Sequence, residues 1–127
     1  MKTALHVLHH QGNDWTRDLD FYIDDLAILT KRLESLNGKK ISPKTAEKAA
    51  RFLAKFVKLR EKVDALKLAL KVREKKVESI VKDNPDQIDD QLRMVNDKLF
   101  ERIKELSGKI AIARYEFNEF LVKNLIK

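Results

Sequence analysis

Residues 14–36 read DWTRDLDFYIDDLAILTKRLESL, and the spacing of apolar side chains in this stretch decides the fold. Successive apolar residues follow one another at alternating intervals of four and three positions. They are Trp15, Leu19, Tyr22, Leu26, Leu29, Leu33 and Leu36. This spacing places a single apolar stripe along an α-helix and is typical of the seam of a coiled coil. The stretch therefore predicts a helix over residues 14–36 that packs lengthwise against other helices.

Two further segments carry the same period. Residues 43–82 repeat it at Ala49, Phe52, Phe56, Leu59, Val63, Leu66, Leu70, Arg73, Val77 and Ile80. Residues 85–126 repeat it at Ile88, Leu92, Val95, Leu99, Ile103, Leu106, Ile110, Ala113, Phe117 and Phe120. The alternation typical of strands extends nowhere beyond a few residues. The sequence therefore predicts an all-α protein: an antiparallel three-helix coiled-coil bundle that forms one domain over residues 1–127.

The breaks between these segments carry helix-ending and helix-starting residues. Asn37-Gly38 is typical of the end of a helix, and Ser42-Pro43 is typical of an N-cap followed by a first turn. Asn84-Pro85 repeats the second signal. Because both connections are short, neighbouring helices are expected to run antiparallel.

The three predicted helices differ in length. At 1.5 Å per residue the second and third are each roughly 60 Å long, whereas the first is roughly 35 Å long. Residues 1–12 fit a short strand, a helical turn or an arm. The end of the bundle near Asn84 would then lack a third helix, so we expect a second copy or another protein to cover it; a frayed hairpin tip is the alternative. The residues expected in such a homodimer contact are Val77, Ile80, Ile88, Leu92 and Val95, together with the off-seam residues Phe21, Ile28, Leu68 and Val72.

The net charge of +7 comes from the middle of the chain, because residues 39–82 hold 15 Lys or Arg and 5 Asp or Glu. Five of these cations recur at intervals of three and four residues and share one helix face, here called the basic stripe: Lys48, Arg51, Lys55, Lys58 and Lys62. Such a row is suited to a nucleic-acid backbone or an acidic surface. In the alternative interpretation, Asp25 lies against Lys55 and Asp18 against Lys62, so that the first helix neutralises the stripe.

The three histidines lie together near the N-terminus. On a helix, His6, His9 and His10 would share one face, and Asp14 follows four positions later. This spacing is suited to a divalent metal ion. The alternative is a polar N-terminal arm without a ligand.

Two seam residues stand out by their chemistry. Arg73 is expected either to extend its charged end to water or to bind Asn96 or Asp97 across the hairpin. Trp15 is expected to anchor the core opposite Leu66.

The sequence lacks the motifs that are typical of common enzyme classes. There is no cysteine, no glycine-rich phosphate loop and no Ser-His-Asp arrangement. Adjacent carboxylates such as Asp24-Asp25 and Asp89-Asp90 point to different sides of a helix, so they do not form an acid–base pair. No run approaches the ~20 apolar residues of a membrane span. We therefore expect a cytoplasmic, non-enzymatic protein with no cofactor, no small-molecule substrate and no membrane partner.

Part of the first helix resembles a known group of proteins. The residues concerned are His10, Trp15, Leu19, Phe21-Tyr22, Asp24-Asp25-Leu26, Leu29 and Arg32-Leu33-Glu34. They resemble the start of a group of uncharacterised bacterial helical-bundle proteins, which share a His, a Trp, a Phe-Tyr pair followed by acidic residues, and a leucine-rich seam. The resemblance implies a bacterial, helical, non-enzymatic protein and assigns no site.

Three functions follow as expectations. The first is a protein-interaction or scaffold protein that forms a homodimer through its helical surfaces. The alternative is a binder of nucleic acid or an acidic surface that uses the basic stripe. The third is a metal-binding bundle that uses the N-terminal histidines.

Overall fold

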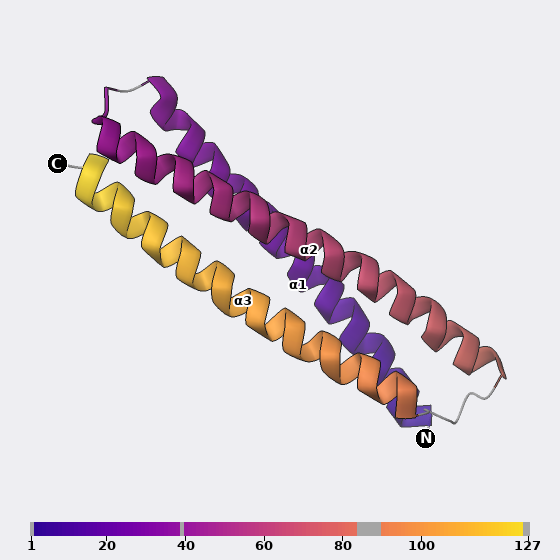
Figure 1. Ribbon diagram of the computed structural model, residues 1–127. Helices are drawn as coiled ribbons and strands as arrows, with labels where there is room; N and C mark the ends of the chain where they lie inside the picture. Colours follow the sequence, from indigo (N-terminus) through magenta and orange to yellow (C-terminus); the bar gives the residue numbers. More distant parts are fainter. Residues whose placement is uncertain (1, 39, 84–89, 126–127) are drawn as a thin grey trace.

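A computed structural model describes residues 2–38, 40–83 and 90–125, and it confirms the all-α three-helix bundle (Figure 1). Helix α1 spans Lys2–Glu34 and is followed by a 3-10 turn at Ser35–Gly38; α2 spans Pro43–Asp83 and α3 spans Asp90–Leu125. The described ranges contain no strand. The predicted helix start at Asn84-Pro85 lies outside the described residues.

The first helix is much longer than the sequence pattern predicted. It begins at Lys2 rather than near Asp14, and its 33 residues compare with 41 in α2 and 36 in α3. Figure 1 shows the N-terminal end of α1 beside the start of α3. The predicted length mismatch is therefore wrong, and so is the inference that one end of the bundle lacks a third helix.

The residues that were expected to be exposed at the end of the bundle near Asn84 are, where described, buried or half-buried instead. Val77 is 4% exposed and Leu92 is fully buried, while Val95 is half-buried. The side chains of Ile80 and Ile88 lie outside the described residues. These positions therefore belong to the core of one chain, and they do not support a homodimer contact.

The seams form the core as the sequence predicted. Leu19 and Val63 are fully buried, and every seam residue whose side chain is described is buried or half-buried. Near the α1–α2 connection the core is aromatic: the ring of Phe52 lies 5.3 Å from that of Phe117 and 5.2 Å from that of Phe120. Burial of these seams is the main source of stability, because isolated helices are marginal in water.

The start of α2 has the predicted cap. The backbone N–H of Thr45 donates to Ser42 Oγ at 3.1 Å, and the helix begins at Pro43. The end of α1 differs from the expected glycine cap, since no described glycine has a positive φ. The chain tightens into the 3-10 turn at Ser35–Gly38 instead, which is another way to satisfy the last carbonyls of a helix.

Candidate functional site

The basic stripe lies along the border between α2 and α3. Each of its five residues is exposed and immediately precedes a seam residue of α2, as Lys55 precedes Phe56. The Nζ atom of Lys55 lies 3.2 Å from Glu116 Oε2 on α3. Because residues three and four apart share a helix face, the remaining stripe residues border α3 as well.

The predicted neutralisation of the stripe by α1 is therefore wrong. Asp25 forms its ion pair with Arg114 of α3. The α2 cation that reaches α1 is Lys67, whose Nζ lies 2.6 Å from Asp20 Oδ1. Lys67 follows the seam residue Leu66, whereas the stripe residues precede theirs, so the two sets lie on opposite flanks of the seam.

Helix α3 extends this basic surface. The contacts of Lys55 with Glu116 and of Lys62 with Lys109 place residues 109–123 of α3 opposite the stripe, while Lys98 and Arg102 lie beyond its end. We call the combined surface the α2–α3 face; its members are Lys48, Arg51, Lys55, Lys58 and Lys62 of α2 and Lys98, Arg102, Glu105, Lys109, Ile112, Glu116, Glu119 and Lys123 of α3. All thirteen are exposed, and the nine cations against three carboxylates give the face a net charge of +6.

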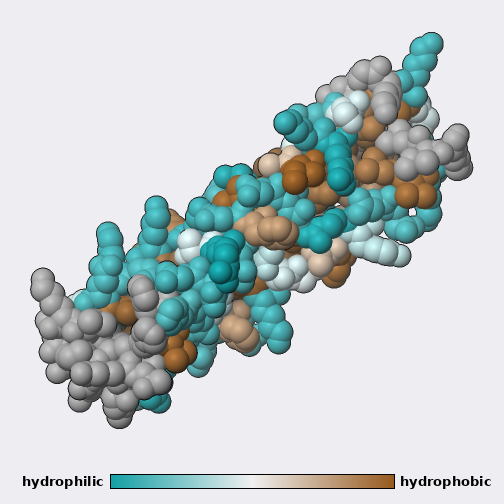
Figure 2. All heavy atoms as spheres, turned by 180° about the vertical axis from the view of Figure 1, so that it is seen from behind, coloured by the Kyte–Doolittle hydropathy of each residue, from teal (hydrophilic) through white to brown (hydrophobic). Residues whose placement is uncertain are grey.

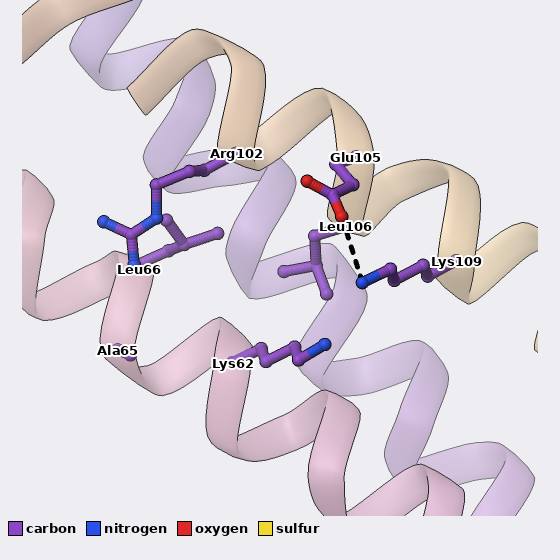
Figure 3. A pocket seen from close by; sticks show the side chains of 7 residues that line it. All are labelled: Lys62, Ala65, Leu66, Arg102, Glu105, Leu106 and Lys109. Atoms are coloured by element: carbon purple, nitrogen blue, oxygen red, sulfur yellow. Dashed lines mark ion pairs between the residues drawn. The ribbon is translucent and has the colours of Figure 1, made fainter. Parts of the chain in front are cut away.

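At the middle of this face the two helices enclose a groove with a volume of about 220 Å³. The core residues Leu66 and Leu106 lie at its base, and Lys62, Arg102, Glu105 and Lys109 line it. Figure 3 shows the ends of Lys62, Glu105 and Lys109 directed toward one another from the two helices, whereas the guanidinium of Arg102 is directed away from them, toward Leu66. We call this feature the inter-helix groove.

The groove holds more positive than negative charge. The side chain of Lys62 meets that of Lys109, and this contact is the main cause of a lowered pKa for Lys62. Glu105 compensates only one of the cations: its Oε1 lies 3.1 Å from Lys109 Nζ, which lowers the pKa of Glu105 and raises that of Lys109. An ammonium group placed against another ammonium group is unfavourable unless an anion joins them.

The other cations of the basic stripe differ in whether they form ion pairs. Arg51 is paired with Glu47 of its own helix at 2.8 Å. Within the described ranges, Lys48 and Lys58 take part in no ion pair. They are therefore available to an external anion without breaking a contact of the bundle.

The expected metal site is not formed by the residues that the structure describes. His10 is exposed, and Asp14 is paired with Arg17 at 2.8 Å. Across the described part of the chain, no group of three or more metal-binding side chains gathers. The side chains of His6 and His9 lie outside that part.

Arg73 is a fully buried polar residue in the core. Its Nε donates to Asn96 Oδ1 at 2.9 Å, its Nη1 to Glu74 Oε1 at 2.8 Å and its Nη2 to the Leu8 carbonyl at 2.7 Å. Its guanidinium also lies over the Trp15 ring, 5.2 Å from the centroid. The expected bond to Asn96 is confirmed, whereas extension to water is wrong. Because acceptors within the protein bind the guanidinium on three sides, we assign Arg73 a structural role.

Gly12 is the residue that the sequence reasoning missed. It is buried, and a Cβ atom at this position would lie 2.6 Å from Arg73 Nη1. Only glycine lets α1 approach the guanidinium this closely. The sequence did contain a pattern that indicates this role, because Leu8 and Gly12 continue the seam of α1 backwards from Trp15 at intervals of four and three residues.

The off-seam apolar residues are exposed as expected. The exposed fractions are 60% for Phe21, 52% for Ile28, 65% for Leu68 and 63% for Val72. On the side of the molecule drawn in Figure 2, apolar surface is broken into patches between hydrophilic side chains. A role for these four residues in self-association stays a prediction.

Fold and surface together define a three-helix bundle with one strongly basic face. The chain matches no protein-family model, no curated protein and no solved structure. The resemblance of residues 10–34 to bacterial helical-bundle proteins therefore stays a prediction. Along the described helices, no stretch combines the length and the apolar character needed to cross a membrane.

Proposed function

We propose that this protein is a cytoplasmic, non-enzymatic binding protein whose α2–α3 face holds the phosphate backbone of duplex nucleic acid. The observation that carries the proposal is the net charge of +6 on thirteen exposed residues along one border between two helices. Phosphate neutralisation by Lys and Arg supplies most of the affinity of sequence-independent binders.

The length of the stripe suits a nucleic-acid strand. From Lys48 to Lys62 the helix rises about 21 Å at 1.5 Å per residue, with a cation about every 5 Å. One strand of a duplex carries one phosphate per roughly 3.4 Å of axis, so the stripe runs beside about six phosphates. Helix α3 adds a second row of cations across the border, including Arg102 and Lys109.

The composition of the face favours a duplex. None of its thirteen residues is aromatic. Binders of single strands stack bases on aromatic side chains, and base-specific readers need side chains that enter a groove. A face of cations on a straight helix pair supports backbone contacts alone, and hence binding without sequence preference.

An acidic membrane surface fits this face less well. Peripheral helices insert an apolar side into the lipid boundary. Here the apolar seams of α2 and α3 are buried in the core, and the exposed apolar residues Val72 and Met94 lie at one end of the face, near Lys98. The stripe from Lys48 to Lys62 therefore lacks the continuous apolar side that membrane insertion needs.

The test is fluorescence anisotropy with a labelled duplex of about 20 base pairs at two salt concentrations. With four to five phosphate contacts, affinity is expected to fall by about 10²- to 10³-fold between 50 and 200 mM salt. The variant Lys48→Gln/Lys58→Gln breaks no ion pair of the described structure, so it should fold normally. It is expected to weaken binding at least about tenfold and to lower the salt slope by about 2.

The matched control is Lys31→Gln/Lys71→Gln, which removes the same charge from exposed positions outside the α2–α3 face. Lys31 lies on α1, and Lys71 follows the seam residue Leu70 on the flank away from α3. The control is expected to weaken binding less than about twofold at physiological salt, where the Debye length is about 8 Å. Absence of binding at low salt, or equal loss in both variants, refutes the proposal.

A second candidate function is a protein-interaction or scaffold role through homodimer formation. It is favoured by the exposure of Phe21 and Ile28, which lie seven residues apart on α1. Their side chains would form a self-complementary apolar contact between two copies. Sedimentation velocity at micromolar concentration tests it: a dimer that Phe21→Ser/Ile28→Ser converts to monomer supports the role, and a monomeric wild-type chain removes it.

A further inference from the structure

The inter-helix groove differs from the rest of the α2–α3 face in how its charges are arranged. Elsewhere each cation is either paired with one carboxylate, as Lys55 is with Glu116, or stands without an ion pair, as Lys58 does. In the groove the ammonium groups of Lys62 and Lys109 point into one space that contains a single carboxylate, Glu105 (Figure 3).

The groove suits a phosphate group because Lys62 and Lys109 approach one space from opposite helices. An anion between them would accept hydrogen bonds from both ammonium groups.

We propose that the inter-helix groove is the subsite where one backbone phosphate of the nucleic acid is held, between Lys62 and Lys109. Glu105 occupies part of this subsite in the unbound protein, where it binds Lys109 at 3.1 Å. It is an internal competitor that the phosphate displaces. This inference rests on the proposed function, because it names the place on the α2–α3 face where binding is strongest.

The contact between Lys62 and Lys109 supports the proposed phosphate subsite. The pKa of Lys62 is lowered chiefly by the side chain and the charge of Lys109, with smaller contributions from partial burial and from Lys58. An anion between the ammonium groups removes that repulsion. Binding of phosphate is therefore expected to raise the pKa of Lys62.

The decisive variant is Glu105→Gln. It keeps the size of the side chain and removes the competing charge, so it is expected to tighten duplex binding about fivefold, the change that corresponds to one exposed ion pair. Its matched control is Glu119→Gln, which removes the same charge from the same face and helix but lies outside the groove and breaks no ion pair of the described structure. The control is expected to tighten binding less than about twofold, because screening at physiological salt confines the effect to about 8 Å.

A second measurement follows Lys62 directly. In protein labelled with ¹³C at lysine Cε, the titration of the Lys62 signal reports its pKa with and without duplex. The pKa of Lys62 is expected to rise on binding in the wild-type protein. Inorganic phosphate and vesicles of anionic phospholipid are titrated as separate probes, since each presents the same phosphate chemistry.

The outcomes separate the two proposals. Tighter binding by Glu105→Gln than by Glu119→Gln, together with a duplex-induced rise in the pKa of Lys62, supports the subsite. Duplex binding with equal effects of the two variants overturns the subsite and leaves the proposed function intact. A response of Lys62 to phosphate or vesicles without duplex binding overturns the nucleic-acid source, and with it the proposed function.

Discussion

The two helical glycines with described surroundings give a matched pair of substitutions whose effects should have opposite sign. A Cβ atom at Gly108 would meet no other atom within 4 Å. At Gly12 it would lie 2.6 Å from Arg73 Nη1 and closer than 3.0 Å to Glu74 Oε1. The first site is open surface on α3, whereas the second is the closest approach of α1 to the buried guanidinium.

The magnitudes follow from the same two environments. Alanine is about 1 kcal/mol better than glycine inside a helix, so Gly108→Ala should raise the free energy of unfolding by about that amount. Gly12→Ala makes the same gain but forces Glu74 away from a charged hydrogen bond worth about 1.5–3 kcal/mol. The guanidinium is unable to move aside, because Asn96 and the Leu8 carbonyl hold its other side. Together with about 1–3 kcal/mol of overpacking, Gly12→Ala should be net destabilising by about 1.5–5 kcal/mol.

Urea unfolding followed by circular dichroism measures both variants against the wild-type chain. A difference of about 2.5–6 kcal/mol between the two variants corresponds to roughly 10–24 °C in melting temperature. Glu74→Ala in the Gly12→Ala background should recover part of the loss, since one of the two clashes is then removed. Equal stabilisation by both alanines would show that α1 does not pack on Arg73 through Gly12.

Three further changes have defined outcomes. Phe117→Ala removes a fully buried ring and should lower the free energy of unfolding by about 3–5 kcal/mol in urea melts, whereas Tyr115→Ala, at a side chain 68% exposed, should change it by less than about 0.5 kcal/mol. Asn96→Ala removes an acceptor of the buried guanidinium and should cost about 1.5–3 kcal/mol; a loss below half of this would contradict the network. The pKa of Glu105 is lowered from 4.5 by Lys109, so its contribution to stability is present above pH 4.5 and is lost as pH falls through the folded-state pKa. Glu105→Gln should therefore show a shallower decline of urea midpoint below pH 4.5, and an unchanged decline would exclude this contribution.

The periodicity of apolar residues determined the helical class and the core. Leu19, Val63 and Ile110 are each buried as the spacing of their seams predicted. The cap at Ser42 and the start of α2 followed from local chemistry in the same way. These features depend on residues close together in the chain, so the sequence alone is sufficient to predict them.

The length of α1 could be determined only from the tertiary structure. Gly12 is a poor helix former by itself, and the polar residues around it hide the backward continuation of the seam. The helix persists because Arg73 of α2 binds the Leu8 carbonyl and because Asn96 of α3 donates to Gln11 Oε1 at 3.1 Å. Partners more than 60 residues away in the chain therefore decide where α1 begins.

Whether α1 or α3 borders the basic stripe also depends on the tertiary structure. A seam pattern states which residues face inward, but the same three seams can close into a bundle of either hand. The hand of the bundle determines whether the residues that precede each α2 seam position border α1 or α3. In this protein they border α3, where Lys109 faces Lys62 and Glu105 compensates only one cation. The sequence therefore determined that the stripe exists, and helix packing determined that its charge remains largely uncompensated.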